Sequence, residues 1–439
     1  MEMKRLKTAI GADAEHDSSV QDVVAAVIAD IGARGDTAVR EYSEKWDNWS
    51  PTAFVLGSDE ISRIVKSIPS TLIADIETVQ QNVRHFAECQ RDSMAEFEIE
   101  TYPGTFLGQK HIPIDAVGAY IPGGRYPLLA SAHMTIVTAR SAGVERITAC
   151  TPPINGGIPA ATIAAMHLAG ADEINVLGGV QAIAAMAVGT ESIMPVDFIT
   201  GPGNQYVAEA KRQLFGRVGI DLLAGPTEIL IVADNDADAF VVAVDLLSQA
   251  EHGPDSPAVL ITTSERLGRD VIAHIDRLLP GMPTRNFAEP AWRNFGEVIV
   301  TEEDIESAYE LANSYASEHV EILTKDPRRA LTAMRNYGAL FLGEGTCVPF
   351  GDKVIGTNHT LPTRGSARYT GGLWVGKFLK TVTYQEVTNL DSSALLGELG
   401  ARASRAESFE GHARACEVRV AKSTRTPLTW APDQKFGQS

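Results

Sequence analysis

The sequence of 439 residues predicts an α/β protein with two parallel-sheet domains. From residue 115 onward, short apolar runs alternate with Ala-rich helical segments, which is the pattern of βαβ units. The same alternation begins again after residue 226, so we expect two such domains with a seam near Pro226. The length supports this division, since one ordinary domain rarely holds so long a chain.

Helices are expected before the first sheet. The segments VQDVVAAVIADIGARG and TLIADIETVQQNVRHFAECQ space their apolar residues near 3.6 positions apart, and the first of them ends in Gly. We expect these N-terminal helices to join the second α/β domain. In the first domain, the expected strands are AVGAYI, RITAC, INVLGG and DFITG, and the expected helices are LLASAHMTIVTARSAG, AATIAAMHLAG and VQAIAAMAV.

The second domain follows the same alternation. EILIVAD predicts a strand, ADAFVVAVDLLSQAEHG a helix, AVLIT a strand, and EDIESAYELANSYAS a helix that leads into the strand VEILT. After TGGLWVGKFLK the alternation stops, and VTNLDSSALLGELGARASRAESFEGHARACEVRV predicts helices that form an arm against another domain or a partner chain. The predicted domains are 1–112 together with 227–370, then 113–226, and finally the arm 371–439.

Charge and cysteine content exclude some partners and compartments. The chain has 38 Lys and Arg against 56 Asp and Glu, a net charge of -18, which disfavours binding to nucleic acid or to an anionic membrane. Its four cysteines lie far apart and include no CxxC pair, as expected in the reducing cytoplasm. Residues 1–10 lack the apolar segment of a secretory signal, and no apolar run is long enough for a transmembrane helix.

Polar clusters in four segments together predict a zinc site beside an acid–base pair. The residues are Gln249 and His252, Asp352 and His359, His412, and the adjacent pair Glu318 and His319. Gln249 and His252 are three positions apart, which places both on one face of a helix. Imidazole and carboxylate groups are ligands that zinc takes, and an adjacent Glu and His can transfer protons near neutral pH.

Each cluster alone also has an ordinary structural explanation. Gln249 and His252 before Gly-Pro suit an exposed helix end, and Asp352 in a Gly-rich loop suits a turn. Glu318 alone would suit a surface position, and His319 alone would suit a half-buried one. Their combination is what indicates a metal-assisted enzyme and not a binding module.

Glycine-rich segments mark the other α/β domain. VGAYIPGGRYP, NVLGGVQAIAA and ITGPGNQYVAEAK each place small residues where a strand passes into a helix. Backbone N–H groups at a helix N-terminus bind pyrophosphate well, so these segments indicate a dinucleotide site. None of them is GxGxxG, and tight turns between strand and helix are the rival explanation.

Seven segments, in this order, resemble histidinol dehydrogenase: GAYIPGGRYPLLASA, GPGNQYVAEAK, AGPTEILIVAD, LLSQAEHGPDS, YASEHVEI, GTNHTLPT and a closing ExxxxH. The resemblance extends from about residue 20 to residue 420. It implies an NAD-dependent, zinc-containing homodimer with two incomplete Rossmann-like domains and C-terminal arms that swap between subunits. In this scheme 113–226 binds NAD, 227–370 holds zinc, and 371–439 is the dimerisation arm.

The resemblance also implies a role for each site residue. The zinc ligands fall on Gln249, His252, Asp352 and His412, the last supplied by the neighbouring subunit. The catalytic pair falls on Glu318 and His319, the NAD contacts on Tyr120, Gln181 and Asn204, and the substrate contacts on Thr227, His319, Asp352, His359 and Glu407. The implied chemistry is a four-electron oxidation of an alcohol to a carboxylate through the aldehyde, with two NAD consumed.

Some positions depart from the histidinol dehydrogenase pattern and indicate a different substrate. They are Ala87, Leu107, His133, Thr227, Arg364, Trp374 and Lys377. Lys377 stands where the family has an acidic residue, and together with His133 it favours an anionic head group over the cationic histidinol. Whether Lys377, His133 or Arg364 contacts the substrate stays open at this stage, since Lys377 also suits a solvated helix position.

The segment GGLWVGKFLKT resembles sulfopropanediol dehydrogenases, which oxidise 2,3-dihydroxypropane-1-sulfonate to 3-sulfolactate. We therefore expect this oxidation, with histidinol or another small alcohol as the alternative substrate. A non-catalytic binding protein of the same fold is the alternative of another class. It would have lost Glu318, His319 or a zinc ligand, and none of these is missing.

Overall fold

The computed structural model describes residues 3–11, 18–123, 127–223, 225–301 and 304–436. The chain forms two compact units. Unit 1 comprises residues 1–91 and 113–378, and unit 2 comprises residues 92–112 and 379–439. None of the helices in the described ranges is both long and apolar enough to span a lipid bilayer. Residues 124–126 of the GGRYP segment and residue 224 of the AGPTEIL segment lie outside the described residues.

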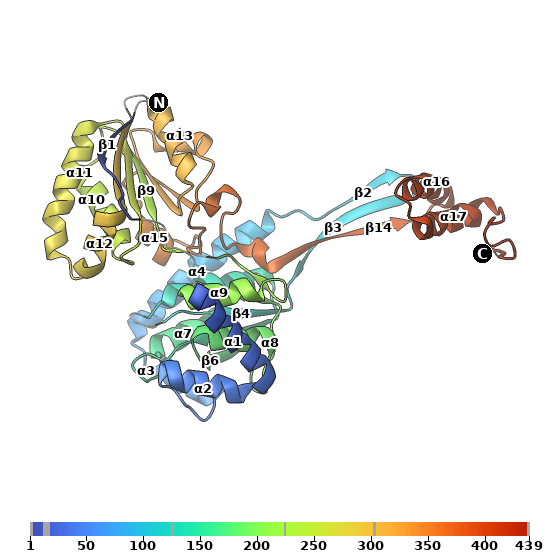
Figure 1. Cartoon of the computed structure of the whole chain (residues 1–439), viewed down its shortest axis with the longest axis horizontal. Helices are drawn as coiled ribbons and strands as arrows, with labels where there is room; N and C mark the ends of the chain where they lie inside the picture. Colours follow the sequence, from blue (N-terminus) through green and yellow to red (C-terminus); the bar gives the residue numbers. More distant parts are fainter. Residues whose placement is uncertain (1–2, 12–17, 124–126, 224, 302–303, 437–439) are drawn as a thin grey trace. The chain divides into compact units, whose positions relative to one another are not determined.

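The first sheet of unit 1 has five parallel strands in the order β6-β5-β4-β7-β8 (Figure 1). Its strands are β4 (Ala116–Tyr120), β5 (Arg146–Thr151), β6 (Glu173–Val176), β7 (Phe198–Thr200) and β8 (Gly219–Ile220). The connecting helices are α5 (Leu129–Ala132), a π-helical turn (His133–Val137), α6 (Thr138–Ala142), α7 (Ala160–Ala169), α8 (Gly179–Val188) and α9 (Gln205–Leu214). The strand order reverses between β4 and β7, which confirms the predicted βαβ alternation in this part of the chain.

The N-terminal helices pack on this first sheet and not, as the sequence suggested, on the second. They are α1 (Ser18–Arg34), α2 (Asp36–Asp47), α3 (Ser58–Ser67) and α4 (Ser70–Asp92). Val24, Val27 and Ile31 of α1 are buried in one cluster with Ile183 and Ala187 of α8. The reason for the difference is that Ala-rich α8 offers a flat apolar surface, which the apolar stripe of α1 covers.

The second sheet of unit 1 has six strands in the order β1-β11-β10-β9-β12-β13, and only the edge strand β1 is antiparallel. Its strands are β1 (Met3–Lys7), β9 (Ile229–Ala233), β10 (Ala258–Thr262), β11 (Gly296–Thr301), β12 (His319–Leu323) and β13 (Ala339–Leu342). The sequence correctly predicts β9, β10 and β12, whereas β11 was not among the expected strands. The N-terminal segment contributes only β1 to this sheet.

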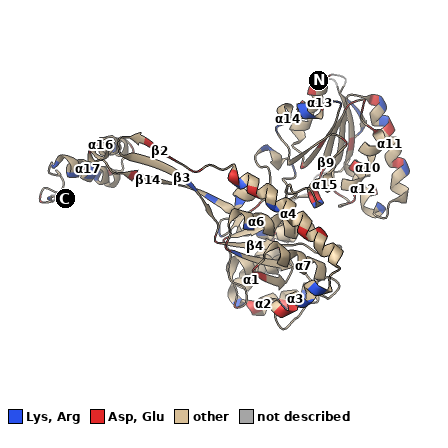
Figure 2. Ribbon diagram, turned by 180° about the vertical axis from the view of Figure 1, so that it is seen from behind, with Lys and Arg blue, Asp and Glu red and all other residues tan. Residues whose placement is uncertain are grey.

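Helices cover both faces of the second sheet. They are α10 (Ala239–Ala250), α11 (Glu265–Leu278), α12 (Arg285–Phe295), α13 (Ile305–Tyr315), α14 (Ala330–Ala333) and α15 (Val348–Lys353). Short 3₁₀ turns are Leu279–Gly281, Pro327–Arg329, Ser366–Arg368 and Val375–Phe378. Figure 2 shows charges of both signs along the outer helices, such as α11, where Arg269 pairs with Glu265 at 2.6 Å.

Unit 2 is an extended three-stranded sheet that carries two packed helices at one end (Figure 1). Its elements are β2 (Phe97–Tyr102), β3 (Thr105–Pro113), β14 (Leu379–Val387), α16 (Leu390–Ala406) and α17 (Glu410–Thr424). Two predicted boundaries therefore change, since 92–112 leaves the N-terminal block and the arm begins at Leu379. The physical reason is that the β2–β3 hairpin finds its third strand in β14, and not in either sheet of unit 1.

Candidate active site

The carboxyl ends of β4 and β7 form the position where sheets of this type usually bind ligands, because the strand order reverses between them. Tyr120 ends β4, and Gly201 follows β7 with a φ of 119°. A Cβ atom at Gly201 would overlap the carbonyl oxygen of Tyr120, so only glycine permits this close approach. Asn204 caps α9, where its side chain accepts hydrogen bonds from the N–H groups of Tyr206 at 3.0 Å and Val207 at 3.1 Å.

A buried ion pair fixes the loop between β7 and α9. Lys211 pairs with Asp221, and the two side chains are 4% and 0% exposed. Lys211 also donates to the carbonyl oxygen of Gly201 at 3.0 Å, and Asp221 accepts from the N–H of Gly201 at 2.7 Å. The shape of the glycine loop therefore depends on this charge pair.

The other two predicted NAD contacts are buried near the same edge. The Tyr120 hydroxyl accepts a hydrogen bond from the N–H of Gly179 at 3.1 Å, and burial raises the pKa of Tyr120 to about 12. Gln181 donates to Asp47 Oδ2 at 2.8 Å, while no described group donates to its own Oε1. The structure thus gathers Tyr120, Gln181 and Asn204 at one end of the sheet, and their contact with NAD stays a prediction.

In the second sheet, the acid–base pair lies at the amino ends of β9 and β12. His319 is in register with Ile229, which brings Glu318 beside the residues that precede β9. Glu318 Oε2 accepts hydrogen bonds from Thr227 Oγ1 at 2.6 Å and from the N–H of Glu228 at 3.0 Å. Burial raises the pKa of Glu318, although His319 and the two hydrogen bonds oppose the rise. Glu318 is therefore a carboxylate that can take up a proton nearer to neutral pH.

His319 lies between two carboxylates. Its Nδ1 is 3.0 Å from the carbonyl oxygen of Glu228 and 3.5 Å from Glu318 Oε2, and its Nε2 is 3.4 Å from Asp352 Oδ1. Burial disfavours the charged imidazole, but the charges of Glu318 and Asp352 outweigh burial and raise the pKa of His319 to about 9. Among the described residues, Asp352 is the partner of Nε2, in a long ion pair that lacks good hydrogen-bond geometry.

Three of the four predicted zinc ligands lie in unit 1 near this pair. Gln249 is in the last turn of α10, and its Oε1 is 3.4 Å from Thr227 Oγ1. His252 follows the same helix, and Asp352 lies on α15. Burial lowers the pKa of His252 despite the nearby Asp352 charge, so its imidazole is neutral near pH 7, which is the form that binds a metal.

The donor chemistry of these side chains fits a zinc ion, although the set is incomplete in unit 1. Over the described residues, no group of three or more His, Cys, Asp and Glu side chains is arranged to hold a metal. Unit 1 supplies two ligands of this kind, His252 and Asp352, with the amide of Gln249 as a third donor. The predicted fourth ligand, His412, and the predicted substrate contact Glu407 belong to unit 2, where both side chains are exposed. Their roles stay predictions.

Among the other predicted substrate contacts in unit 1, His359 touches the predicted ligand Asp352. Its Nδ1 is 3.1 Å from the carbonyl oxygen of Asp352, and burial lowers its pKa. His133 lies in the π-helical turn, with Nδ1 3.1 Å from Gln80 Nε2, and burial lowers its pKa to about 4. Burial therefore favours the neutral imidazole and disfavours a positive charge at His133, and its contact with the substrate stays a prediction.

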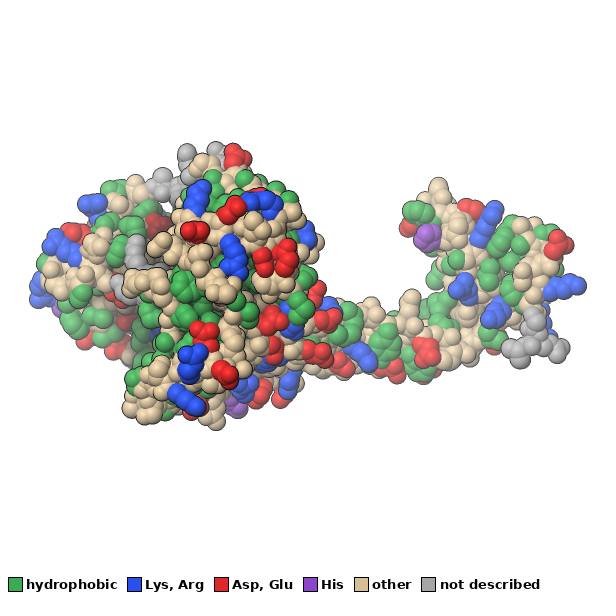
Figure 3. Space-filling view, turned by 90° about the horizontal axis from the view of Figure 1, so that it is seen from below, with side chains coloured by type: hydrophobic (Ala, Val, Ile, Leu, Met, Phe, Trp, Pro, Cys, Tyr) green, Lys and Arg blue, Asp and Glu red, His purple; other side chains and the backbone are tan. Residues whose placement is uncertain are grey.

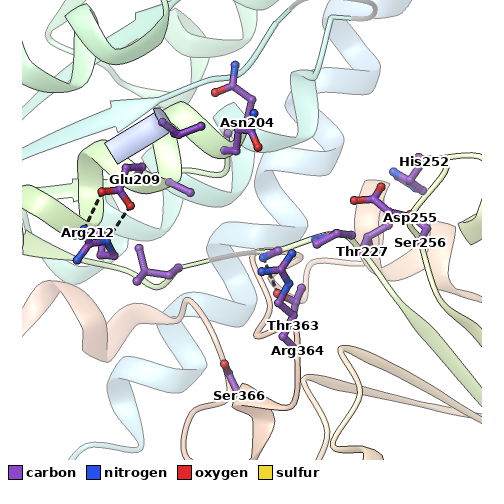
Figure 4. Close-up of a pocket in the computed structure, with 18 of the residues that line it drawn as sticks. Asn204, Glu209, Arg212, Thr227, His252, Asp255, Ser256, Thr363, Arg364 and Ser366 are labelled. Atoms are coloured by element: carbon purple, nitrogen blue, oxygen red, sulfur yellow. Dashed lines mark hydrogen bonds and ion pairs between the residues drawn. The ribbon is translucent and has the colours of Figure 1, made fainter. Parts of the chain in front are cut away.

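A cavity of about 650 Å³ brings residues of both sheets together. Asn204 lines it from the first sheet, and Thr227 and His252 line it from the second (Figure 4). Arg364 also lines this cavity. Lys377 does not line it, and lies half-buried in the 3₁₀ turn Val375–Phe378.

Sequence reasoning missed a pair of buried acids, Asp245 and Glu321. Glu321 lies two residues after His319, and its Oε1 accepts from the N–H of Val348 at 3.0 Å. Its other oxygen receives no hydrogen from any described donor and faces the Asp245 carboxyl. Burial raises the pKa of Asp245 to about 6, and burial together with the Asp245 charge raises the pKa of Glu321 to about 8. The pair therefore shares a proton at neutral pH.

The acid pair joins the three elements that carry the candidate site. Asp245 lies one helical turn before Gln249, Glu321 shares β12 with His319, and Val348 begins the helix that carries Asp352. The sequence did contain a signal, since Glu321 is a charged residue inside the apolar strand HVEIL. A charged residue in a strand that is buried on both faces needs a specific partner.

Comparison with known proteins identifies the family. A family model described as histidinol dehydrogenase matches residues 11–420. This chain belongs to the histidinol dehydrogenase family. The family consists of NAD-dependent dehydrogenases, so the enzyme class predicted from the sequence is confirmed at that level.

Individual proteins that resemble this chain support its assignment to the histidinol dehydrogenase family. A histidinol dehydrogenase homolog from Shouchella clausii is 57% identical over 91% of this chain and 94% of its own length. Sulfopropanediol 3-dehydrogenase from Ruegeria pomeroyi is 44% identical over 99% of both chains. The crystal structure of histidinol dehydrogenase from Elizabethkingia anophelis matches with a TM-score of 0.89 at 35% identity, and the match covers 95% of each chain. The predicted α/β fold is thus confirmed.

Proposed function

We propose that this chain is a zinc-dependent, NAD-linked dehydrogenase that oxidises a small primary alcohol to a carboxylate through the aldehyde. The observation that carries the proposal is the cluster of half-buried Thr227 with buried Glu318 and His319 at the amino edge of the second sheet. Thr227 also lines the cavity that Asn204 reaches from the first sheet, so a cofactor and a substrate can meet there.

The two catalytic residues divide the proton transfers between them. His319 would accept the hydroxyl proton at Nε2, while its Nδ1 is held by the Glu228 carbonyl. Glu318 would take a proton from the water that adds to the aldehyde. When bound, NAD would supply the hydride acceptor, and zinc held by Gln249, His252, Asp352 and His412 would polarise the reacting oxygen.

Metal binding also bears on the protonation of His319. When no cation is bound to Asp352, the carboxylates of Glu318 and Asp352 both favour the charged imidazole. If Asp352 were bound to a cation, its charge would favour the protonated imidazole less. The pKa of His319 would then fall toward neutral pH, where the imidazole can accept a proton.

The preferred substrate is 2,3-dihydroxypropane-1-sulfonate, which would become 3-sulfolactate. Two observations support this choice: the GGLWVGKFLKT segment, and the relative that is named sulfopropanediol 3-dehydrogenase. L-Histidinol is the alternative, favoured by the name of the family and of the matching crystal structure. The separated cysteines favour a reducing compartment, so we propose that the reaction takes place in the cytoplasm.

We further propose a homodimer in which the exchanged arm brings Glu407 and His412 to the partner's site. Unit 2 exposes large apolar side chains on its surface (Figure 3). Leu395 and Leu399 of α16 lie four residues apart and are each more than half exposed. An exposed apolar row of this kind is typical of a surface that another chain covers.

NAD reduction by the purified enzyme tests the proposal directly. We expect faster turnover of dihydroxypropanesulfonate than of L-histidinol, loss of activity on chelation, and recovery with zinc. Glu318→Gln serves as the control that keeps the shape of the site and removes the carboxylate. Undiminished turnover after complete metal removal would refute the role of zinc, and a higher kcat/KM for L-histidinol would refute the sulfonate as substrate. A protein that binds zinc but does not reduce NAD in the presence of any alcohol tested would instead be the non-catalytic binding protein.

A further inference from the structure

We propose that Arg364 forms an anion-binding subsite in the active-site cavity and binds a negatively charged head group on the alcohol substrate. The inference rests on the proposed function, and it assigns the head group to a residue other than Lys377 and His133. Four features of Arg364 support it: its backbone conformation, the path of its side chain, its place in the cavity and its lack of a partner.

The backbone of Arg364 is held in an unfavourable conformation. Its φ is 53°, in the left-handed region that a residue with a side chain rarely adopts. Thr363 stabilises the turn, since its Oγ1 accepts from the N–H of Gly225 at 2.6 Å and its carbonyl oxygen accepts from the N–H of Ser366 at 3.0 Å. The N–H of Arg364 itself faces the Glu228 carboxyl. Strain that is held in this way is typical of functional positions.

The side chain of Arg364 runs beside the segment that leads to Thr227. A Cβ atom at Gly225 would lie 2.6 Å from Arg364 Nε and 2.9 Å from its Cδ. The absence of a side chain at Gly225 is therefore what leaves room for the arginine. Arg364 lines the cavity together with Thr227 and His252, both of which belong to the proposed catalytic machinery (Figure 4).

The guanidinium of Arg364 forms no ion pair among the described residues, in contrast to the second arginine of the cavity. The other arginine that lines the cavity, Arg212, forms two hydrogen bonds with Glu209, each 2.7 Å long. The guanidinium of Arg364 has no hydrogen bond or ion pair with any residue that the structure describes. Asp255, a carboxylate of the same cavity, lies toward His252 and Ser256 in Figure 4. A free guanidinium presents parallel N–H groups that match the oxygens of a sulfonate or a carboxylate.

Kinetics of the Arg364→Gly enzyme test the subsite. Glycine suits the positive φ, so this variant removes the guanidinium without stressing the fold. We expect its kcat/KM for dihydroxypropanesulfonate to fall by about 10- to 100-fold, the range for a hydrogen bond to a charged group. Its kcat/KM for glycerol, a neutral alcohol of the same carbon chain, and its KM for NAD should change by less than about twofold. Arg364→Lys keeps the charge but lacks the paired N–H groups. Its kcat/KM for dihydroxypropanesulfonate should therefore lie between those of the wild type and Arg364→Gly.

Arg425→Gly is the matched control, because Arg425 also has a positive φ, of 56°, but lies in unit 2 at the end of α17. Arg425→Gly should leave kcat/KM unchanged for both dihydroxypropanesulfonate and glycerol. Equal losses for the anionic and the neutral alcohol in Arg364→Gly would overturn the proposal. A rise confined to the KM for NAD would overturn it as well, and would assign the cation to the pyrophosphate. A loss in Lys377→Gln with none in Arg364→Gly would place the head group at Lys377 and would equally overturn it.

Calorimetric binding of 3-sulfolactate separates this inference from the proposed function. We expect the wild-type enzyme to bind this product and Arg364→Gly to bind it about 10-fold or more weakly, whether or not the alcohol is turned over. Such a result with no turnover would refute the proposed substrate and keep the subsite. No binding by the wild-type enzyme, or equal binding by both proteins, would refute the subsite.

Discussion

The Glu321→Gln substitution tests whether Asp245 and Glu321 share a buried proton. The amide has the shape of the protonated acid, so its oxygen can still accept from the N–H of Val348 and its N–H can donate to Asp245. We therefore expect this variant to fold normally at pH 6. The effect of the substitution should appear in how the free energy of unfolding depends on pH.

The expected magnitude follows from the pKa of Glu321, which burial raises from 4.5 to about 8. The folded state then binds more protons than the unfolded state. Protonation of Glu321 therefore adds to the free energy of unfolding in full below pH 4.5, and this stabilisation is lost as the pH rises through 8. At about 1.4 kcal/mol per pKa unit, Glu321 alone should lower the free energy of unfolding by about 3 kcal/mol between pH 6 and pH 9. Because Glu321 lies in unit 1, which has about 360 residues, that is a fall in Tm of about 4 °C.

Scanning calorimetry of chelator-treated protein at pH 6, 7, 8 and 9 measures this term. His319 titrates in the same range but is present in both proteins, so the difference between wild type and variant isolates Glu321. As the pH rises, the Tm of the wild type should fall more steeply than the Tm of Glu321→Gln. Glu310→Gln, on the exposed side of α13, should follow the wild type throughout. Parallel Tm curves for wild type and Glu321→Gln would refute the shared proton.

Three further substitutions probe the two sheet edges. Lys211→Met leaves its carboxylate partner buried without a counter-charge, so the free energy of unfolding measured in urea should fall by about 3–5 kcal/mol, and an unchanged value would contradict the structural role. Gly201→Ala drives a Cβ atom into the carbonyl oxygen of Tyr120, so NADH titration by fluorescence should show affinity lowered about 10-fold or more, and unaltered affinity would remove this loop from the cofactor site. His319→Asn removes the proposed base, so kcat should fall by about 10²–10⁴ with an unchanged circular dichroism spectrum, whereas near-normal turnover would exclude His319 as the base.

The periodicity of the sequence was sufficient to predict most elements. The 3.6-residue spacing predicted α1 and α4, and the short apolar runs predicted seven of the buried parallel strands, namely β4, β5, β6, β7, β9, β10 and β12. Periodicity records that one face of an element is apolar, but not which surface will cover it. This is why the N-terminal helices were assigned to the wrong sheet. The strands β2, β3 and β14 were not predicted at all.

The sequence by itself determined the family and the order of the elements, because both are carried by local patterns and ordered motifs. Only the tertiary structure decided which candidate cation is free to meet an anion. Burial favours the neutral form of His133, Lys377 is not among the residues that line the cavity, and Arg364 lines it because Gly225 leaves space. The shared proton of Asp245 and Glu321 was equally a matter of the fold, since the protonation of a carboxyl group depends on burial and neighbouring charge, and both arise from residues distant in the sequence.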